Sequence, residues 1–180
     1  MRYPHPATTS ILVILFLVAC TTEEPSPTPQ VNLGNMQTTI QRTVDPADIV
    51  AYAQLADEET LALGQEVYET NCASCHGING EGQFPDAPMQ PDDTGRIGAP
   101  PHDSTGHTWH HADELLYEIV RDGGAGTPDR FYPMPAFGDQ LSDDEIVAVI
   151  AYIKTMWSEE ERLIQAERTL LARSQSTLGE

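Results

Sequence analysis

Three stretches of the chain carry apolar residues at the spacing of an amphipathic helix. They cover residues 58–71, residues 113–121, and a segment that begins at residue 142 and runs through Ile153. Within each stretch the apolar residues recur three and four positions apart, which places them on one face of a helix. No segment of useful length alternates apolar and polar residues. The pattern therefore predicts an all-α domain.

Local start and stop signals support these helices. Ser142 and Glu145 have the spacing of a capping box, which predicts that the third helix starts there. Gly123 and the glycine after it predict the end of the second helix. Asp45-Pro46 reads as an N-cap followed by proline at the first helical position, so a short helix to about residue 56 is expected before the domain.

The periodic segments define a globular region at residues 57–157, enough for one small domain. Residues 77–111 are rich in Gly, Pro, Asp and His and show no periodicity. A structureless loop of that length is unusual in a compact domain, unless it wraps a large cofactor. Residues 158–180 form an acidic, helical C-terminal extension. We expect a solvated tail there, with packing back onto the domain as the alternative.

The first helix leads into Cys72-Ala73-Ser74-Cys75-His76. Cys-x-x-Cys-His is the attachment pattern of haem c: two thioethers to the porphyrin, with His76 as the proximal iron ligand. A dithiol redox pair, half of a zinc site and a structural disulfide are the alternatives. Zinc would need a second ligand pair about 12 to 15 residues on, and the next histidine, His102, lies much farther away. A redox pair would sit in a βαβ pattern, and a disulfide leaves His76 without a role.

A methionine or a second histidine could fill the other axial position of the iron. The candidates are Met134, Met89, Met156, His102, His107, His110 and His111. Met134 lies between two prolines just before the third helix, and these stiffen the backbone and keep it out of helix. Met156 is expected to pack in the core, and Met89 in an acidic loop is the second choice. We therefore expect Met134 as the ligand, which would raise the reduction potential relative to a second histidine.

Histidines gather just before the second helix, from His102 to His111, around Trp109. Histidines near a helix start usually cap it or face solvent, and we expect this more than a second metal site. The indole N–H of Trp109, which only donates, is a candidate partner for a haem propionate, and plain packing is the alternative.

Residues 1–19 predict a signal peptide. An apolar run of nine residues follows Arg2 and is too short to span a bilayer, which takes about 20. The run ends in Leu-Val-Ala-Cys20, which resembles the bacterial lipobox, so Cys20 is expected to become a lipidated N-terminus. An ordinary secretory signal is the alternative, and both export the protein. Residues 20–56 then form a Pro- and Thr-rich tether with the possible short helix.

The chain is strongly acidic, with a formal net charge of −19, and loss of the signal peptide would make it one unit more negative. Such a surface repels nucleic-acid phosphates and excludes nucleic acid as a partner. It would favour a redox partner that presents a basic docking patch.

Residues 57–157 resemble the class I cytochromes c. The resemblance rests on Gly64 and Tyr68 in the first helix, Cys-Ala-Ser-Cys-His-Gly, a proline in the middle loop, Met-Pro-Ala-Phe, and Tyr152 in the last helix. It implies an all-α fold around one covalent haem c, with the first and last helices crossing near Gly64. It also implies that the carbonyl of Pro100, or of the proline after it, accepts a hydrogen bond from the proximal histidine.

The same resemblance implies electron transfer without turnover of a substrate, so the chain is not expected to be an enzyme by itself. The expected function is that of an exported, membrane-anchored carrier between respiratory or photosynthetic redox proteins. A fixed haem subunit of a larger quinol-oxidising or terminal oxidase complex is the alternative. A haem-based sensor of small ligands is less favoured, because it needs Met134 to leave the iron open.

Overall fold

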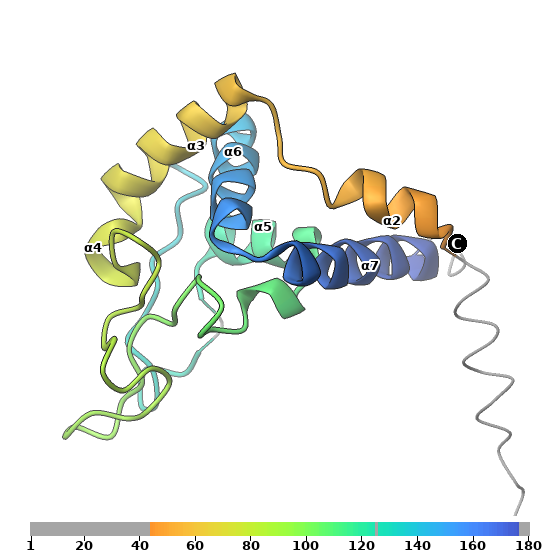
Figure 1. Cartoon of the computed structure of the whole chain (residues 1–180). Helices are drawn as coiled ribbons and strands as arrows, with labels where there is room; N and C mark the ends of the chain where they lie inside the picture. Colours follow the sequence, from red (N-terminus) through yellow and green to blue (C-terminus); the bar gives the residue numbers. More distant parts are fainter. Residues whose placement is uncertain (1–43, 125, 177–180) are drawn as a thin grey trace, which may run out of the picture. The chain divides into compact units, whose positions relative to one another are not determined.

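The computed structural model describes residues 44–124 and 126–176, which belong to one compact unit (Figure 1). The described residues form helices and no β-strand, with isolated bridges at Pro91–Ile97 and Ile97–Phe131. The all-α prediction is confirmed. The helices are α2 (Pro46–Tyr52), α3 (Glu58–Asn71), α4 (Ala73–His76), α5 (Asp113–Asp122), α6 (Asp143–Ile153) and α7 (Glu159–Ser176), with 3₁₀ turns η1 (Thr108–His110) and η2 (Lys154–Met156).

The helix ends follow the local sequence signals. The side chain of Asp57 accepts a hydrogen bond from Thr60 N at 2.9 Å at the start of α3. The capping box of α6 is complete, because the Ser142 hydroxyl accepts from Glu145 N while the Glu145 carboxylate accepts from Ser142 N. Helix α5 ends at Gly123, whose φ of 92° suits glycine.

Helices α3 and α6 cross at Gly64, and this contact is the most extensive between any two described elements (Figure 1). A Cβ atom on Gly64 would lie 2.1 Å from the carbonyl oxygen of Ala148 and 2.8 Å from Cβ of Tyr152. Only glycine therefore allows the two backbones to approach this closely. The crossing near Gly64 that the resemblance implied is present.

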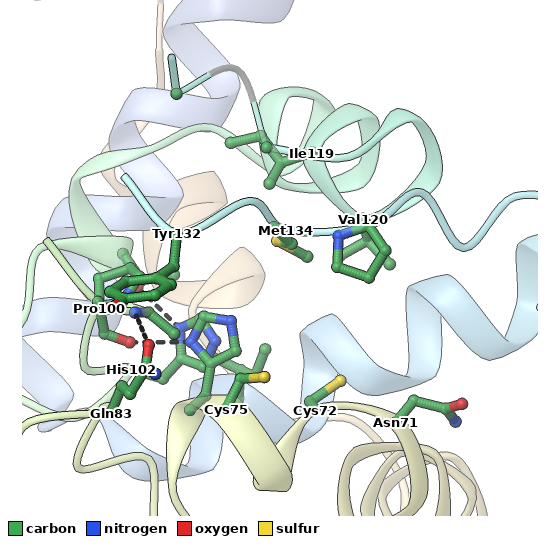
Figure 2. Close-up of a pocket in the computed structure, with 18 of the residues that line it drawn as sticks. Asn71, Cys72, Cys75, Gln83, Pro100, His102, Ile119, Val120, Tyr132 and Met134 are labelled. Carbon is green, nitrogen blue, oxygen red and sulfur yellow. Dashed lines mark hydrogen bonds between the residues drawn. The ribbon is translucent and has the colours of Figure 1, made fainter. Parts of the chain in front are cut away.

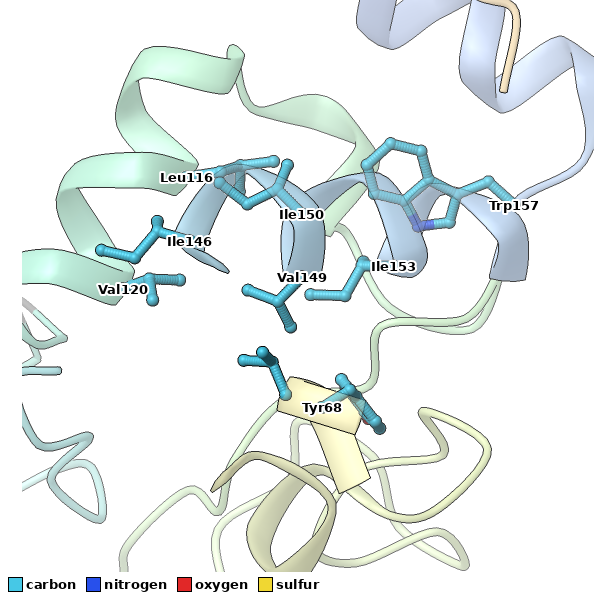
Figure 3. Packing of buried hydrophobic residues seen from close by; sticks show 9 residues of the cluster. Tyr68, Leu116, Val120, Ile146, Val149, Ile150, Ile153 and Trp157 are labelled. Carbon is cyan, nitrogen blue, oxygen red and sulfur yellow. The ribbon is translucent and has the colours of Figure 1, made fainter. Parts of the chain in front are cut away.

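The core lies where α3, α5 and α6 meet (Figure 3). Tyr68 is fully buried and its hydroxyl donates to the carbonyl of Gly77 at 2.8 Å, so the core is tied to the turn that follows α4. Trp157 closes the other end, and its indole N–H donates to the carbonyl of His102 at 2.7 Å. The buried cluster consists of Val67, Tyr68, Leu116, Val120, Ile146, Val149, Ile150, Ile153 and Trp157.

Helix α7 packs against the domain, so the expectation of a solvated tail was wrong. Its buried face is largely polar, with Gln165 and Thr169 almost completely buried beside Ala166. The Gln165 amide donates to Oδ1 of Asp113 at 2.6 Å and to the carbonyl of His111 at 3.2 Å. Hydrogen bonds rather than an apolar stripe hold this helix in place, which explains why hydrophobic periodicity missed the contact.

Helix α2 lies along α7, so the compact unit extends beyond residues 57–157 at both ends (Figure 1). The hydroxyl of Tyr52 donates to Oδ2 of Asp113 at 2.6 Å, and Lys154 donates to the same oxygen at 2.8 Å. One partly buried carboxylate thus joins α2, α5 and η2. None of the helices in the described part of the chain has the length and apolar character that crossing a membrane requires.

Candidate functional site

A cavity of about 720 Å³ opens between α4, the middle loop, α5 and the loop before α6. Cys72, Cys75, His76 and Met134 all line it, so the structure brings the four principal predicted residues to one site. Figure 2 shows Met134 on the side of the cavity that faces the two cysteines. Much of the wall is apolar, including Ile97, Leu116, Ile119, Val120, Phe131, Phe137, Val149, Ile150 and Ile153.

The two cysteines lie within reach of the cavity as free thiols. Cys72 is half-buried at the end of α3 and Cys75 is exposed on α4. Burial, and next the neighbouring Cys75, raise the pKa of the Cys72 thiol to about 11. Reactive dithiol pairs have a lowered pKa, so this environment does not favour a redox pair. No group of three or more His, Cys, Asp or Glu side chains between residues 44 and 176 could hold a metal ion, leaving residue 125 aside, so zinc is not supported either.

The orientation of the His76 ring suits iron ligation. His76 is buried, and its Nδ1 lies 2.9 Å from the carbonyl oxygen of Pro100. A carbonyl only accepts, so Nδ1 carries the proton and Nε2 keeps its lone pair. Burial lowers the pKa of His76, and the Pro100 carbonyl opposes this only in part, so the ring stays neutral. The resemblance allowed Pro100 or the proline after it as the acceptor, and the carbonyl that accepts from His76 is that of Pro100.

The segment that carries Met134 is fastened to the C-terminal end of α5. Gly124 N donates to the carbonyl of Met134 at 3.1 Å, and Phe137 N donates to the carbonyl of Val120 at 3.0 Å. A Cβ on Gly124 would come within 3.0 Å of the Met134 side chain, so glycine there lets the two segments touch. Of the other candidate methionines, Met89 also lines the cavity, while Met156 packs against the core cluster.

The histidine cluster is not arranged as expected. His102, His107 and His111 line the cavity, and only His110 is exposed away from it. The ring of His102 stacks on that of His76, with centroids 4.1 Å apart. The expectation that these residues cap a helix or face solvent was therefore wrong for three of the four, because the chain before α5 turns them inward.

Trp109 does not line the cavity and packs against the core cluster instead. Its indole N–H is buried, and no hydrogen-bond partner for it exists among the described residues. A buried donor without a partner is costly, so this atom fits a bond to a group that the chain does not itself supply. The bond to a haem propionate stays a prediction.

Sequence reasoning missed the contact between the middle loop and the methionine segment. The hydroxyl of Tyr132, which lines the cavity, donates to Oδ2 of Asp92 at 2.8 Å. Ile97 N donates to the carbonyl of Arg130, and Tyr132 N donates to the carbonyl of Ile97 at 3.0 Å. The acidic loop is thereby a strap across the segment that ends in Met134. Asp92 and Tyr132 lie 40 positions apart in the chain, and nothing in the sequence around either residue signals their contact.

Comparison with known proteins agrees with this geometry. The family model described as "Cytochrome c" matches residues 61–157. Cytochrome c6 from Chlorolobion braunii is 31% identical over 96 residues, which are 53% of this chain and 90% of that protein. Cytochrome c6 from Tetradesmus obliquus is 33% identical over 93 residues, which are 52% of this chain and 86% of that protein.

The chain is also similar to a subunit of a larger enzyme. The cbb3-type cytochrome c oxidase subunit CcoP of Azospirillum sp. (strain B510) is 30% identical over 101 residues, which are 56% of this chain but only 30% of that protein. No solved structure matches the chain significantly.

The cavity fits a haem on this structure's own terms. It combines two free thiols, a neutral histidine with a free lone pair, a methionine opposite and an apolar wall. The matched region covers more than half of the chain. This protein therefore belongs to the cytochrome c family, as a class I monohaem c-type cytochrome with one covalently attached haem c.

Proposed function

We propose that the chain passes single electrons between redox proteins through a haem c bound at Cys72 and Cys75, with His76 and Met134 as axial ligands. The observation that carries this proposal is the single cavity lined by all four residues. When bound, the haem supplies an iron that changes its oxidation state by one electron. No group in this arrangement is needed to bind or activate a substrate.

The chain's own residues orient the ligands. Pro100 holds the proton on Nδ1 of His76, so that Nε2 is the atom free to ligate. Two backbone hydrogen bonds, from Gly124 N to the carbonyl of Met134 and from Phe137 N to the carbonyl of Val120, hold the methionine segment at the end of α5. Methionine sulfur is a weak ligand, so a restrained backbone lowers the entropy cost of keeping it on the iron. Methionine ligation favours a higher reduction potential than bis-histidine ligation.

The test is to express the chain in a bacterial host that attaches haem c and to record visible spectra in both oxidation states. We expect a low-spin spectrum that carbon monoxide does not change. Met134→Ala should abolish the iron–sulfur charge-transfer band and let the reduced form bind carbon monoxide. Met89→Ala is the matched control, because Met89 lines the same cavity, and it should leave both unchanged.

Other results would contradict the proposal. A wild-type protein that binds carbon monoxide readily would remove methionine ligation and favour a sensor of small ligands. Loss of the band in Met89→Ala and not in Met134→Ala would move the ligand to the middle loop. Absence of covalent haem would refute the attachment at Cys72 and Cys75.

We further propose that the chain is exported and anchored through a lipid on Cys20, with residues 20–56 as tether. Cys20 and the signal peptide lie outside the described residues, and the support is the sequence alone. The acidic charge of −19 favours partners with a basic docking patch, whose association should slow as salt increases. Mass spectrometry of the purified N-terminus would detect the lipid, and an unmodified N-terminus beyond Cys20 would refute it.

A fixed place in a larger oxidoreductase is the second candidate. The similarity to the oxidase subunit CcoP favours it, although the match covers less than a third of that protein. Extraction of membranes in mild detergent separates the two candidates. A carrier should purify by itself, and a subunit should purify with the other chains of a quinol-oxidising or terminal oxidase complex.

A further inference from the structure

Two histidines of the cavity have no role in the proposed haem ligation. His107 and His111 both line the wall, with ring centroids 5.2 Å apart and planes at 72°. Among the residues that the structure describes, no lysine or arginine lines the cavity. Histidines are therefore the only side chains of that described lining that can carry a positive charge, in a protein with 28 acidic and nine basic residues.

The other two histidines that line the cavity, His76 and His102, already have partners within the chain. His76 donates to the Pro100 carbonyl and is the proposed ligand. His102 stacks on His76, and its Nδ1 lies 3.0 Å from the hydroxyl of Thr108. That hydroxyl donates to the carbonyl of Pro101 at 3.3 Å, so it accepts from the Nδ1–H of His102. Burial lowers the pKa of His102 well below its ordinary value, so this ring stays neutral. His107 and His111 remain.

Several neutral donors on the wall are also used within the chain. Their hydrogen bonds run from Asn71 to the Val67 carbonyl at 3.0 Å, from Tyr132 to Asp92 at 2.8 Å, and from Gln140 to the Ala136 carbonyl at 3.4 Å. A haem brings two propionate carboxylates, and carboxylates out of water need charged or hydrogen-bonding partners. The thioether edge of a bound porphyrin would be held by Cys72 and Cys75, and its propionates would be carried by the other two pyrroles.

We propose that His107 and His111 hold the haem propionates and take up a proton when the haem is reduced. This inference rests on the haem attachment proposed above. One electron comes from the redox donor and one proton from solvent, so the charge added to the haem is balanced at the imidazoles.

The groups that face this pair are known. His102 faces His107 from the loop before η1, while His110 and Arg168 face His111 from η1 and α7. Burial, and then the positive charge that His107, His110 and Arg168 can carry, lower the pKa of His111 in the chain alone. Propionates beside the rings act in the opposite direction, because a carboxylate favours the charged imidazolium.

The sign of the effect follows from charge. Reduction makes the haem less positive by one unit, so the imidazolium form is more stable in the reduced protein and its pKa is higher there. Between the two pKa values the reduced protein binds more protons than the oxidised one. The reduction potential should therefore fall as pH rises through this window.

The test is a spectroelectrochemical titration of the haem-loaded chain across neutral pH. We expect the wild-type potential to fall with rising pH, and His107→Gln and His111→Gln each to lose part of that fall. The double variant should lose most of it. His110→Gln is the matched control, since His110 is exposed and off the wall, and it should keep the wild-type profile.

Three results would overturn the inference: an unchanged slope in the double variant, no slope in the wild type, or the same loss in His110→Gln. If a variant fails to retain haem, NMR titration of the wild-type imidazoles decides. The pKa of His111 should then be higher in the reduced than in the oxidised protein, and equal values would refute the proposal. Failure of the proposed function is distinguishable, because it removes covalent haem or the methionine band in every variant.

Discussion

Gly64→Ala should destabilise the domain although alanine is the better helix former. The new Cβ would lie 2.1 Å from the Ala148 carbonyl oxygen, whereas real Cβ atoms essentially never come within 3.0 Å of such an atom. The atom that it meets is backbone and cannot rotate away, so α3 and α6 must separate. Overpacking of this kind costs typically about 1–3 kcal/mol, and we expect the upper end.

The helix propensity gained by replacing glycine with alanine offsets about 1 kcal/mol of that cost. The net loss should be about 2 kcal/mol, or a decrease of about 8 °C in Tm for a domain of this size. Guanidinium unfolding of the haem-loaded chain, followed by far-ultraviolet circular dichroism, measures it. The midpoint should fall while the slope stays unchanged.

Ala62→Gly is the matched control for the propensity contribution. Ala62 is exposed two positions earlier on the same helix, so this change should cost about 1 kcal/mol through propensity alone. If Gly64→Ala is as stable as the wild type or more stable, the helices do not approach as closely as the structure has them, and the steric argument is refuted.

Two further predictions concern the strap and the α2–α5–α7 junction. Tyr132→Phe removes the hydrogen bond to Asp92 and should raise the apparent affinity of the oxidised protein for added imidazole about fivefold, which is the factor for one ordinary hydrogen bond. Asp86→Ala is the control, because Asp86 is exposed in the same loop. Equal imidazole affinities in the two variants would contradict the prediction. Asp113 is buried, which raises its pKa, but the charge and hydrogen bond of Lys154 outweigh this and lower the pKa below its ordinary 3.8. The ionised Asp113 carboxylate therefore contributes its full stabilisation at pH values above the ordinary pKa of 3.8. This stabilisation is lost as the pH falls through the lower pKa of the folded protein. Acid titration of unfolding free energy between about pH 5 and about pH 2 should show a steeper loss in the wild type than in Asp113→Asn, and equal slopes would refute the assignment.

The polar junction gives α7 a structural role that its composition does not suggest. Asp113 accepts from Tyr52, Lys154 and Gln165, which come from α2, η2 and α7. Thr169 on α7 accepts in turn from the backbone N–H of Asp113 at 3.1 Å. The helix before the domain and the helix after it are therefore held by one carboxylate, close to the histidines that precede α5.

The helices and the attachment motif of this protein could be predicted from the amino-acid sequence. The bounds of α3, the capping box of α6 and the glycine end of α5 were all predictable, because spacing and caps are properties of residues close together in the chain. Cys-x-x-Cys-His is local for the same reason: its three side chains share one turn. The resemblance added Pro100, whose carbonyl does accept from His76.

The arrangement of the irregular segments became visible only in the folded chain. The fold turned His102, His107 and His111 into the cavity, joined Tyr132 to Asp92, and buried the polar face of α7. These contacts link residues far apart in the chain through loops without periodicity, so no local pattern encodes them. Hydrogen bonds hold them more than apolar stripes do, and an isolated polar side chain carries no signal of whether its partner is water or protein.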